Sequence, residues 1–246
     1  MSRPLPFALL LALGLMACAS EQTRSENRNA ARVNTQLGIN YAERGQYDIA
    51  LEKLNRAIKQ DEKLASAHAA MAFVYQKTGD AERAERHYRL ALELDVEDPS
   101  LKNNFGVFLC GQLRNEEAER YFLEAARNPR YATPEAAWTN AGLCAKSSDL
   151  DKAAKYLREA LGLRPDSREA LAQMAIISYE KAEYLSARAF LQRYNLKASA
   201  TAELLYVATR TEAELGDMAA ARQYEQRLKL EFPESEEAAS SNQSTK

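Results

Sequence analysis

Six alanines recur along this chain at an almost constant interval. Their spacings are 34, 34, 35, 34 and 34 residues, and they are Ala50, Ala84, Ala118, Ala153, Ala187 and Ala221. Eleven or twelve residues before each of them stands a second short residue, in turn Gly38, Ala72, Gly106, Gly142, Ala175 and Thr209. A period of this length, kept over most of the chain, is the signature of a solenoid whose units pack on their neighbours.

Each repeat divides into two halves with a polar turn between them. In residues 65–98, for example, both halves place apolar side chains three to four residues apart, which is the period of an amphipathic helix. Gly79 followed by Asp80 is typical of a helix end and the N-cap of the next helix. The short residue in each half predicts that two antiparallel helices cross closely. Prolines stop the second helix at the end of three repeats, at Pro129, Pro165 and Pro233.

This pattern of short residues, aromatic residues and closing prolines resembles the tetratricopeptide repeat family. The resemblance implies an all-α, right-handed superhelical solenoid of helix-turn-helix units. The template fits six repeats, at 31–64, 65–98, 99–134, 135–167, 168–201 and 202–234. Residues 235–246 are low in apolar side chains, and we expect them to be a disordered tail.

Residues 1–17 read as a secretory signal peptide. Arg3 provides a cationic start and an apolar run of nine residues follows, which is far shorter than the roughly 20 residues of a membrane-spanning helix. The run ends in Leu15-Met16-Ala17-Cys18, which resembles the bacterial lipobox. That resemblance implies that Cys18 carries a diacylglycerol and an N-acyl lipid. The alternative is an ordinary secretory signal followed by a chance cysteine.

The residues after Cys18 indicate the destination of the protein. Ala19 and Ser20 follow, with no Asp in the slot that signals inner-membrane retention in the lipoproteins that this segment resembles. The resemblance implies an outer-membrane lipoprotein that faces the periplasm of a Gram-negative bacterium. Several acyl chains on one residue give stable attachment. Residues 18–30 are polar without an apolar face, and we expect a flexible tether there.

The composition argues against an enzyme and against nucleic-acid binding. The formal net charge is −2, and no basic stripe is present. Of the two histidines, His68 occupies a packing position, and we expect His87 to be solvated among arginines. The sequence holds neither a His or Cys pair at metal-ligand spacing nor a glycine-rich phosphate loop. We therefore expect no metal, no cofactor apart from the lipid on Cys18, and no small-molecule substrate.

Two cysteines remain in the repeats, Cys110 and Cys144. They occupy nearly the same turn of the first helix in adjacent repeats, which pack side by side. In an oxidising periplasm a disulfide between them would close a loop of about 35 residues and add up to about 3–4 kcal/mol of stability. The alternative is two small core residues.

The inner face of the array carries an apolar ladder. The position after each first-helix short residue holds Asn in many tetratricopeptide proteins, where it helps to clamp a peptide carboxylate. Here the successive residues are Ile39, Phe73, Val107, Leu143, Ile176 and finally Arg210, and one turn earlier stand Thr35, Ala69 and Asn103. The ladder predicts either a protein-binding groove for an apolar segment or packing inside a tight superhelix. We assign the groove to Thr35, Ile39, Ala69, Phe73 and Val107.

A lipobox, a short polar segment and six repeats together resemble the type IV pilus pilotin family (PilF/PilW). The runs Gln36–Tyr41, Asn103–Phe108 and Trp138–Gly142 also look like that family. The resemblance implies a non-catalytic protein whose partner is the pilus secretin, and which promotes the localisation and multimerisation of the secretin in the outer membrane. The alternative is a lipoprotein adaptor for another envelope machine, such as outer-membrane protein insertion or the recruitment of peptidoglycan hydrolases.

Overall fold

The computed structural model describes the backbone of residues 7–243 and the side chains of residues 21–241. Arg3, the predicted cationic start, lies outside the described residues. Thirteen α-helices and no strand occur in the described part of the chain. Contacts divide the chain into two compact units, Met1–Leu101 and Lys102–Lys246. Within the described residues, no helix is both long enough and apolar enough to cross a membrane.

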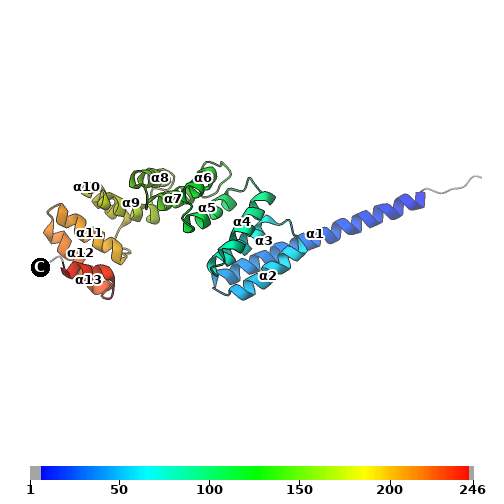
Figure 1. Cartoon of the computed structure of the whole chain (residues 1–246), viewed down its shortest axis with the longest axis horizontal. Helices are drawn as coiled ribbons and strands as arrows, with labels where there is room; N and C mark the ends of the chain where they lie inside the picture. Colours follow the sequence, from blue (N-terminus) through cyan, green and yellow to red (C-terminus); the bar gives the residue numbers. More distant parts are fainter. Residues whose placement is uncertain (1–6, 244–246) are drawn as a thin grey trace, which may run out of the picture. The chain divides into compact units, whose positions relative to one another are not determined.

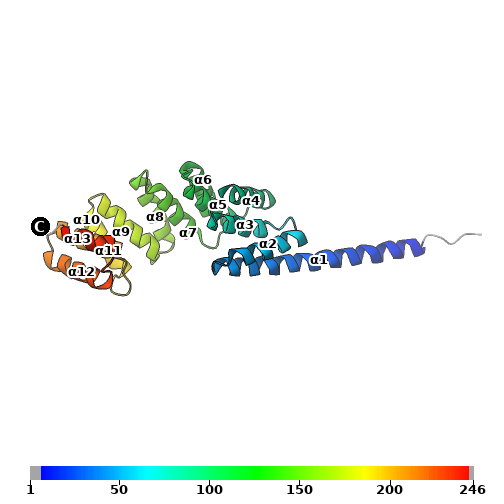
Figure 2. The ribbon, with the colours of Figure 1, turned by 60° about the horizontal axis from the view of Figure 1, so that its bottom comes forward.

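The first unit consists of two antiparallel helix pairs. Its helices are α1 (Phe7–Glu43), α2 (Tyr47–Gln60), α3 (Ala65–Lys77) and α4 (Ala81–Leu94). The turns within the pairs contain Gly45 and Gly79 at φ of +72° and +83°, a backbone conformation that glycine adopts without strain. Asp80 then caps α4, because its carboxylate accepts a hydrogen bond from the backbone N–H of Arg83. Figures 1 and 2 show α1 lying beside α2, with the amino-terminal part of α1 projecting beyond it.

The second unit continues the same alternation. Its helices are α5 (Pro99–Gly111), which begins just before the boundary, α6 (Asn115–Ala126), α7 (Pro134–Ala145), α8 (Leu150–Leu163), α9 (Arg168–Glu180), α10 (Tyr184–Tyr194), α11 (Ala202–Glu214), α12 (Met218–Glu231) and α13 (Glu236–Gln243). Successive helices pack against one another from α6 to α13. The side chains of Asp149, Ser167, Thr201 and Asp217 cap four of these helices.

The recurring short residues lie where paired helices touch. All six alanines that set the period are buried. A Cβ atom added at Gly38, Gly106 or Gly142 would lie within 2.7 Å of a side-chain atom of the partner helix. The prediction that short residues permit close helix crossing therefore matches the packing, and the all-α tetratricopeptide fold is confirmed.

Two segments expected to lack structure are helical instead. Residues 18–30, predicted to be a flexible tether, continue α1 without a break. The segment contains neither glycine nor proline, and its Ala, Glu, Gln and Arg residues have high helix propensity, so a polar sequence is no obstacle to a solvated helix.

The predicted disordered tail is the other correction. Residues 236–243 form α13, which packs on α11 and α12. Ala238 is buried in a cluster with Leu205 and Leu228, and Phe232 and Tyr224 border it. Ala238 alone gave too weak an apolar signal in the sequence, but it packs on side chains that the last repeat would otherwise leave in water. Residues 244–246 lie outside the described residues.

Candidate functional site: an apolar surface on the first unit

The predicted groove residues of the first unit lie on α1 and α3, which are in contact. Thr35 is only 4% exposed, and its hydroxyl donates a hydrogen bond to the carbonyl of Ala31 one turn back at 2.9 Å. It is therefore a packing residue, and its burial contradicts its assignment to the groove. Ile39 and Ala69 are half-buried. A partner would reach only part of these two side chains.

Phe73 is the predicted groove residue that the first unit exposes most. Its side chain is 37% exposed, and the ammonium group of Lys77 lies 5.4 Å from the centre of the ring. A cation at that distance interacts favourably with an aromatic face. Phe73 thus offers an apolar edge to a partner while one part of the ring is already occupied by a cation.

Two exposed apolar residues on α1 were missed from the sequence. Val33 is 60% exposed and Leu37 is 40% exposed. The buried side of α1 includes Ala31, Thr35 and Ala42. At 100° per residue, Val33 and Leu37 lie on the opposite side of the helix. Their spacing of four residues, out of phase with the buried residues, is the sequence signal that could have found them.

The second unit holds the rest of the ladder, and its exposure changes along the unit. Val107 on α5 is 40% exposed, and Leu143 on α7 is half-buried. Ile176 on α9 is only 4% exposed, in a cluster with Met174 and Ile177. The packing alternative therefore holds at Ile176, whereas Val107 is accessible to a partner.

Polar contacts occupy much of the face around this part of the ladder. The amide of Asn140 donates to the side-chain oxygen of Asn103 at 2.9 Å, which ties α7 to α5. Lys146 lies 3.6 Å from the carboxylate of Glu180. Arg210, which replaces the ladder residue in the last repeat, has a buried Nε without a hydrogen-bond partner. The pKa of Arg210 is raised, chiefly by a hydrogen bond with Tyr179.

The structure places Cys110 and Cys144 as a disulfide-bonded pair between α5 and α7. Their Cα atoms are 5.8 Å apart, in the ordinary range for a disulfide. Cys144 is buried and Cys110 is half-buried. The pair would add a covalent tie to the helices that also carry the Asn103–Asn140 hydrogen bond.

The two histidines form a stacked pair in the first unit. Their Nδ1 atoms are 3.1 Å apart, and the Nε2 of His68 lies 3.0 Å from the carbonyl oxygen of Glu62. The expectation that His87 is solvated is wrong, because its ring lies against both His68 and Tyr75. Burial lowers the pKa of His87 to about 4, and the nearby His68, Arg86 and Arg83 act in the same direction. His87 is therefore neutral at ordinary pH.

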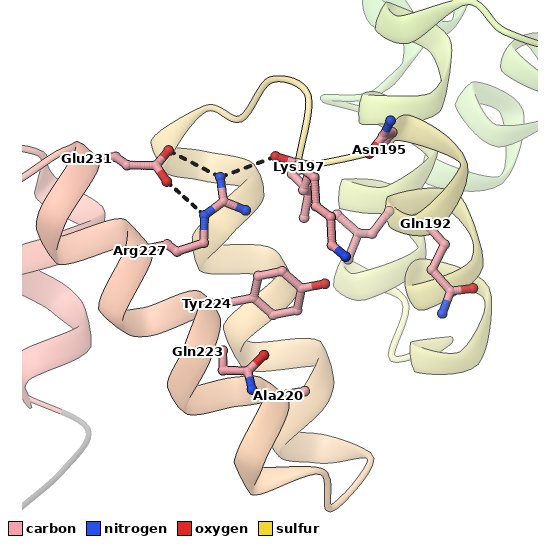
Figure 3. A pocket seen from close by; sticks show the side chains of 10 residues that line it. Gln192, Asn195, Lys197, Ala220, Gln223, Tyr224, Arg227 and Glu231 are labelled. Atoms are coloured by element: carbon pink, nitrogen blue, oxygen red, sulfur yellow. Dashed lines mark hydrogen bonds and ion pairs between the residues drawn. The ribbon is translucent and has the colours of Figure 1, made fainter.

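An open groove of 740 Å³ lies between α10, the loop after it and α12. Figure 3 shows that amide and phenol groups line it, notably those of Gln192, Gln223 and Tyr224. Arg227 donates to the carboxylate of Glu231 at 2.7 Å and to the carbonyl of Leu196 at 3.2 Å. Because these bonds use its guanidinium group to hold the loop on α12, we assign Arg227 a structural role. In the described part of the chain, no three metal-ligating side chains converge.

Comparisons with known proteins agree with this architecture. The chain matches the TPR repeat model over residues 38–79 and the tetratricopeptide repeat model over 65–97 and 136–167. It is 31% identical over 231 residues to the type IV pilus assembly protein PilF of Pseudomonas aeruginosa. That alignment covers 91% of this chain and 92% of the relative.

Solved structures give the same relationship. A structure from the functional characterisation of Pseudomonas aeruginosa PilF matches with a TM-score of 0.80 at 31% identity, covering 91% of this chain and 99% of that one. The crystal structure of PilW, described as a widely conserved type IV pilus biogenesis factor, matches with a TM-score of 0.77 at 30% identity. It covers 85% of this chain and 97% of PilW. This chain therefore belongs to the PilF/PilW family of type IV pilus biogenesis proteins, which are built from tetratricopeptide repeats.

Proposed function

We propose that this protein is a pilotin: a non-catalytic scaffold, anchored in the outer membrane by lipid on Cys18, that brings the type IV pilus secretin to that membrane and promotes its multimerisation. The observation that carries the proposal is family membership over nearly the whole chain. The exposed apolar residues of the first unit support it, because a scaffold needs a surface that is not used for its own packing.

The proposed anchor stands at the start of the unit that carries this surface. Cys18 lies within α1, and the same helix continues to Val33, Leu37 and Ile39. A lipid on Cys18 would therefore be joined to the apolar surface by continuous helix instead of a flexible tether. A client bound there would be held at a limited distance from the bilayer.

The proposed client contacts are Leu37 on α1 and Phe73 on α3; Ile39 is half-buried and lies about 160° from Leu37 around α1, so it is left out. Burying a whole apolar side chain of this size is worth about 1.5–3 kcal/mol. Because Leu37 is 40% and Phe73 37% exposed, a client can bury only the remaining fraction of each, worth about 0.6–1.2 kcal/mol. Replacing both with Ser is expected to weaken client binding roughly tenfold.

The first experiment tests the anchor. Cys18→Ser should abolish palmitate labelling and reduce secretin multimers in the outer membrane, while the repeats stay folded. Palmitate labelling that persists in this variant would contradict the lipid assignment. Secretin multimers at the normal level in an unlabelled variant would contradict the pilotin role.

The second experiment tests the surface. Leu37→Ser/Phe73→Ser should lower secretin capture from detergent-solubilised envelopes without changing the circular-dichroism melt. Leu185→Ser/Leu230→Ser is the matched control, because both leucines are exposed but lie in the second unit. Equal capture of the secretin by the two double variants would refute the assignment of Leu37 and Phe73 as client contacts. Capture of an insertion machine or a peptidoglycan hydrolase in place of the secretin would favour the adaptor alternative.

A further inference from the structure

A basic hollow lies in the first unit where α1 leaves its packed neighbours. Its volume is 880 Å³, and it is lined by Arg24, Asn27, Arg28, Ile58, Lys59, Gln60, Asp61, Glu62 and Lys63. The first three residues belong to α1, and the others belong to the end of α2 and the loop that follows. Figure 1 shows α1 projecting past this end of α2.

The hollow has an excess of positive charge that the protein does not neutralise. Four cationic side chains line it, those of Arg24, Arg28, Lys59 and Lys63, against the two carboxylates of Asp61 and Glu62. All four are exposed, and none has an ion pair within the described residues. The carboxylate of Asp61 already accepts a hydrogen bond from the backbone N–H of Lys63 at 3.1 Å.

Several cations elsewhere in the same unit are paired with carboxylates. Arg83 lies 2.5 Å from Asp80, and Arg89 lies 2.6 Å from Glu85. Arg32, Arg44 and Lys77 also have no ion pair within the described residues, but the hollow brings four such cations together in a chain whose net charge is −2. Such a local excess on an otherwise acidic protein points to an anionic ligand.

The hollow stands close to the proposed lipid on Cys18. A helix rises about 1.5 Å per residue, so Arg24 and Arg28 lie about 9 Å and 15 Å along α1 from Cys18. The headgroup region of one leaflet is about 5–8 Å thick, and electrostatic attraction extends about 8–10 Å further. With Cys18 at the bilayer surface, a tilt of α1 brings the hollow within reach of lipid phosphates.

We propose that this hollow binds the phosphate headgroups of anionic phospholipids in the bilayer that carries the lipid anchor. This inference rests on the proposed lipidation of Cys18 for its geometry. The cations supply a second, electrostatic attachment, which fixes the direction in which α1 leaves the membrane. The apolar surface on α1 and α3 is then presented in one orientation instead of swinging about the acyl chains.

The test uses protein that has no lipid, so that its outcome does not depend on Cys18. The chain is exported behind an ordinary cleavable signal and begins at Ser in place of Cys18. Residues 21–29 are exposed, so this start disturbs no described core contact. Flotation is measured with vesicles of phosphatidylcholine alone and with vesicles in which one third of the lipid is phosphatidylglycerol.

We expect binding to the phosphatidylglycerol vesicles that high salt abolishes. Each basic residue near an anionic surface contributes about fivefold to partitioning, so Arg24→Gln/Arg28→Gln should lower binding by about 25-fold. Lys59→Gln/Lys63→Gln should act similarly. The matched control is Arg56→Gln/Arg86→Gln, which removes the same charge from exposed arginines that pair with Glu52 and Glu82.

Three results would overturn the proposal: no preference for phosphatidylglycerol, an equal loss in the control variant, or displacement by inorganic phosphate at matched ionic strength. The last would mean that the hollow takes free phosphate and not a membrane surface. Failure of palmitate labelling at Cys18 would instead remove the anchor and leave the vesicle result standing. The two proposals can therefore fail separately.

Discussion

Gly142→Ala tests the close helix crossing on which every repeat depends. Gly142 lies within α7, and an added Cβ would be 2.7 Å from the Cγ of Leu157 and 3.2 Å from the backbone oxygen of Ala153. Leu157 is fully buried, so it has little room to move. Ala gains about 1 kcal/mol over Gly in a helix, but overpacking costs about 1–3 kcal/mol. With three atoms closer than the normal contact distance, we expect the high end of the overpacking cost and a net loss of about 1–2 kcal/mol.

The matched control is Gly162→Ala in α8, because no atom lies within 4 Å of its Cβ position. That change should be neutral or stabilise the protein by up to about 1 kcal/mol. The assay is thermal unfolding followed by circular dichroism, in which 1 kcal/mol corresponds to about 2–4 °C for a chain of this size. In a Leu157→Ala background, Gly142→Ala should lose most of its cost, because the clash with the Leu157 side chain is gone and only the contact with the Ala153 oxygen remains. A Gly142→Ala melt at or above that of Gly162→Ala would refute the reasoning.

Three further experiments test the disulfide, the pKa of His87 and the backbone conformation of Leu113. Thiol titration of the denatured, unreduced protein should find neither Cys110 nor Cys144 free, and Cys144→Ser should lower stability by up to about 3–4 kcal/mol; two titratable thiols in periplasmic protein would exclude the bridge. The pKa of His87 is about 4 in the folded state and 6.5 unfolded, so the stability that it provides is present above pH 6.5 and is lost as the pH falls toward 4. Because His87 is only partly buried, we expect a loss of about 1–2 kcal/mol in urea titrations, and His87→Gln should remove that part of the pH dependence. Leu113 has φ of +60° and is exposed, so Leu113→Gly should raise the melting temperature by relieving about 1 kcal/mol of strain; an unchanged or lower melting temperature would contradict this.

Features set by neighbouring residues in the chain were predictable from the sequence. The alanine period and the apolar spacing gave the helix pairs, and Gly79 with Asp80 gave a turn and a cap that the structure contains. These signals act within one helix or one turn, where a short residue or a positive φ has a direct physical reason. Predicting these features did not require knowing which helices pack together in the folded chain.

Exposure depends on contacts between repeats, and there the sequence was ambiguous. Phe73 and Ile176 occupy equivalent positions, yet one is 37% exposed and the other 4%. Their own repeats do not distinguish them; the neighbouring helices do, and at Ile176 a dense cluster closes over the side chain. His87 was misjudged for a different reason, since the His68 and Tyr75 that shield it come from α3, the other helix of its own repeat.

The outer ends of the two units, at α13 and α1, differ in whether an apolar side is covered by another part of the chain. On the last repeat, α13 lies over Leu205 and Leu228, although its own sequence is polar enough to suggest disorder. Solenoids need such caps because a terminal repeat otherwise leaves its apolar side in water. On α1 the side that carries Val33 and Leu37 has no such cover within the first unit. Since the chain supplies a helix for one terminal surface, the exposed Val33 and Leu37 on α1 agree with the proposed role of this side as a partner surface.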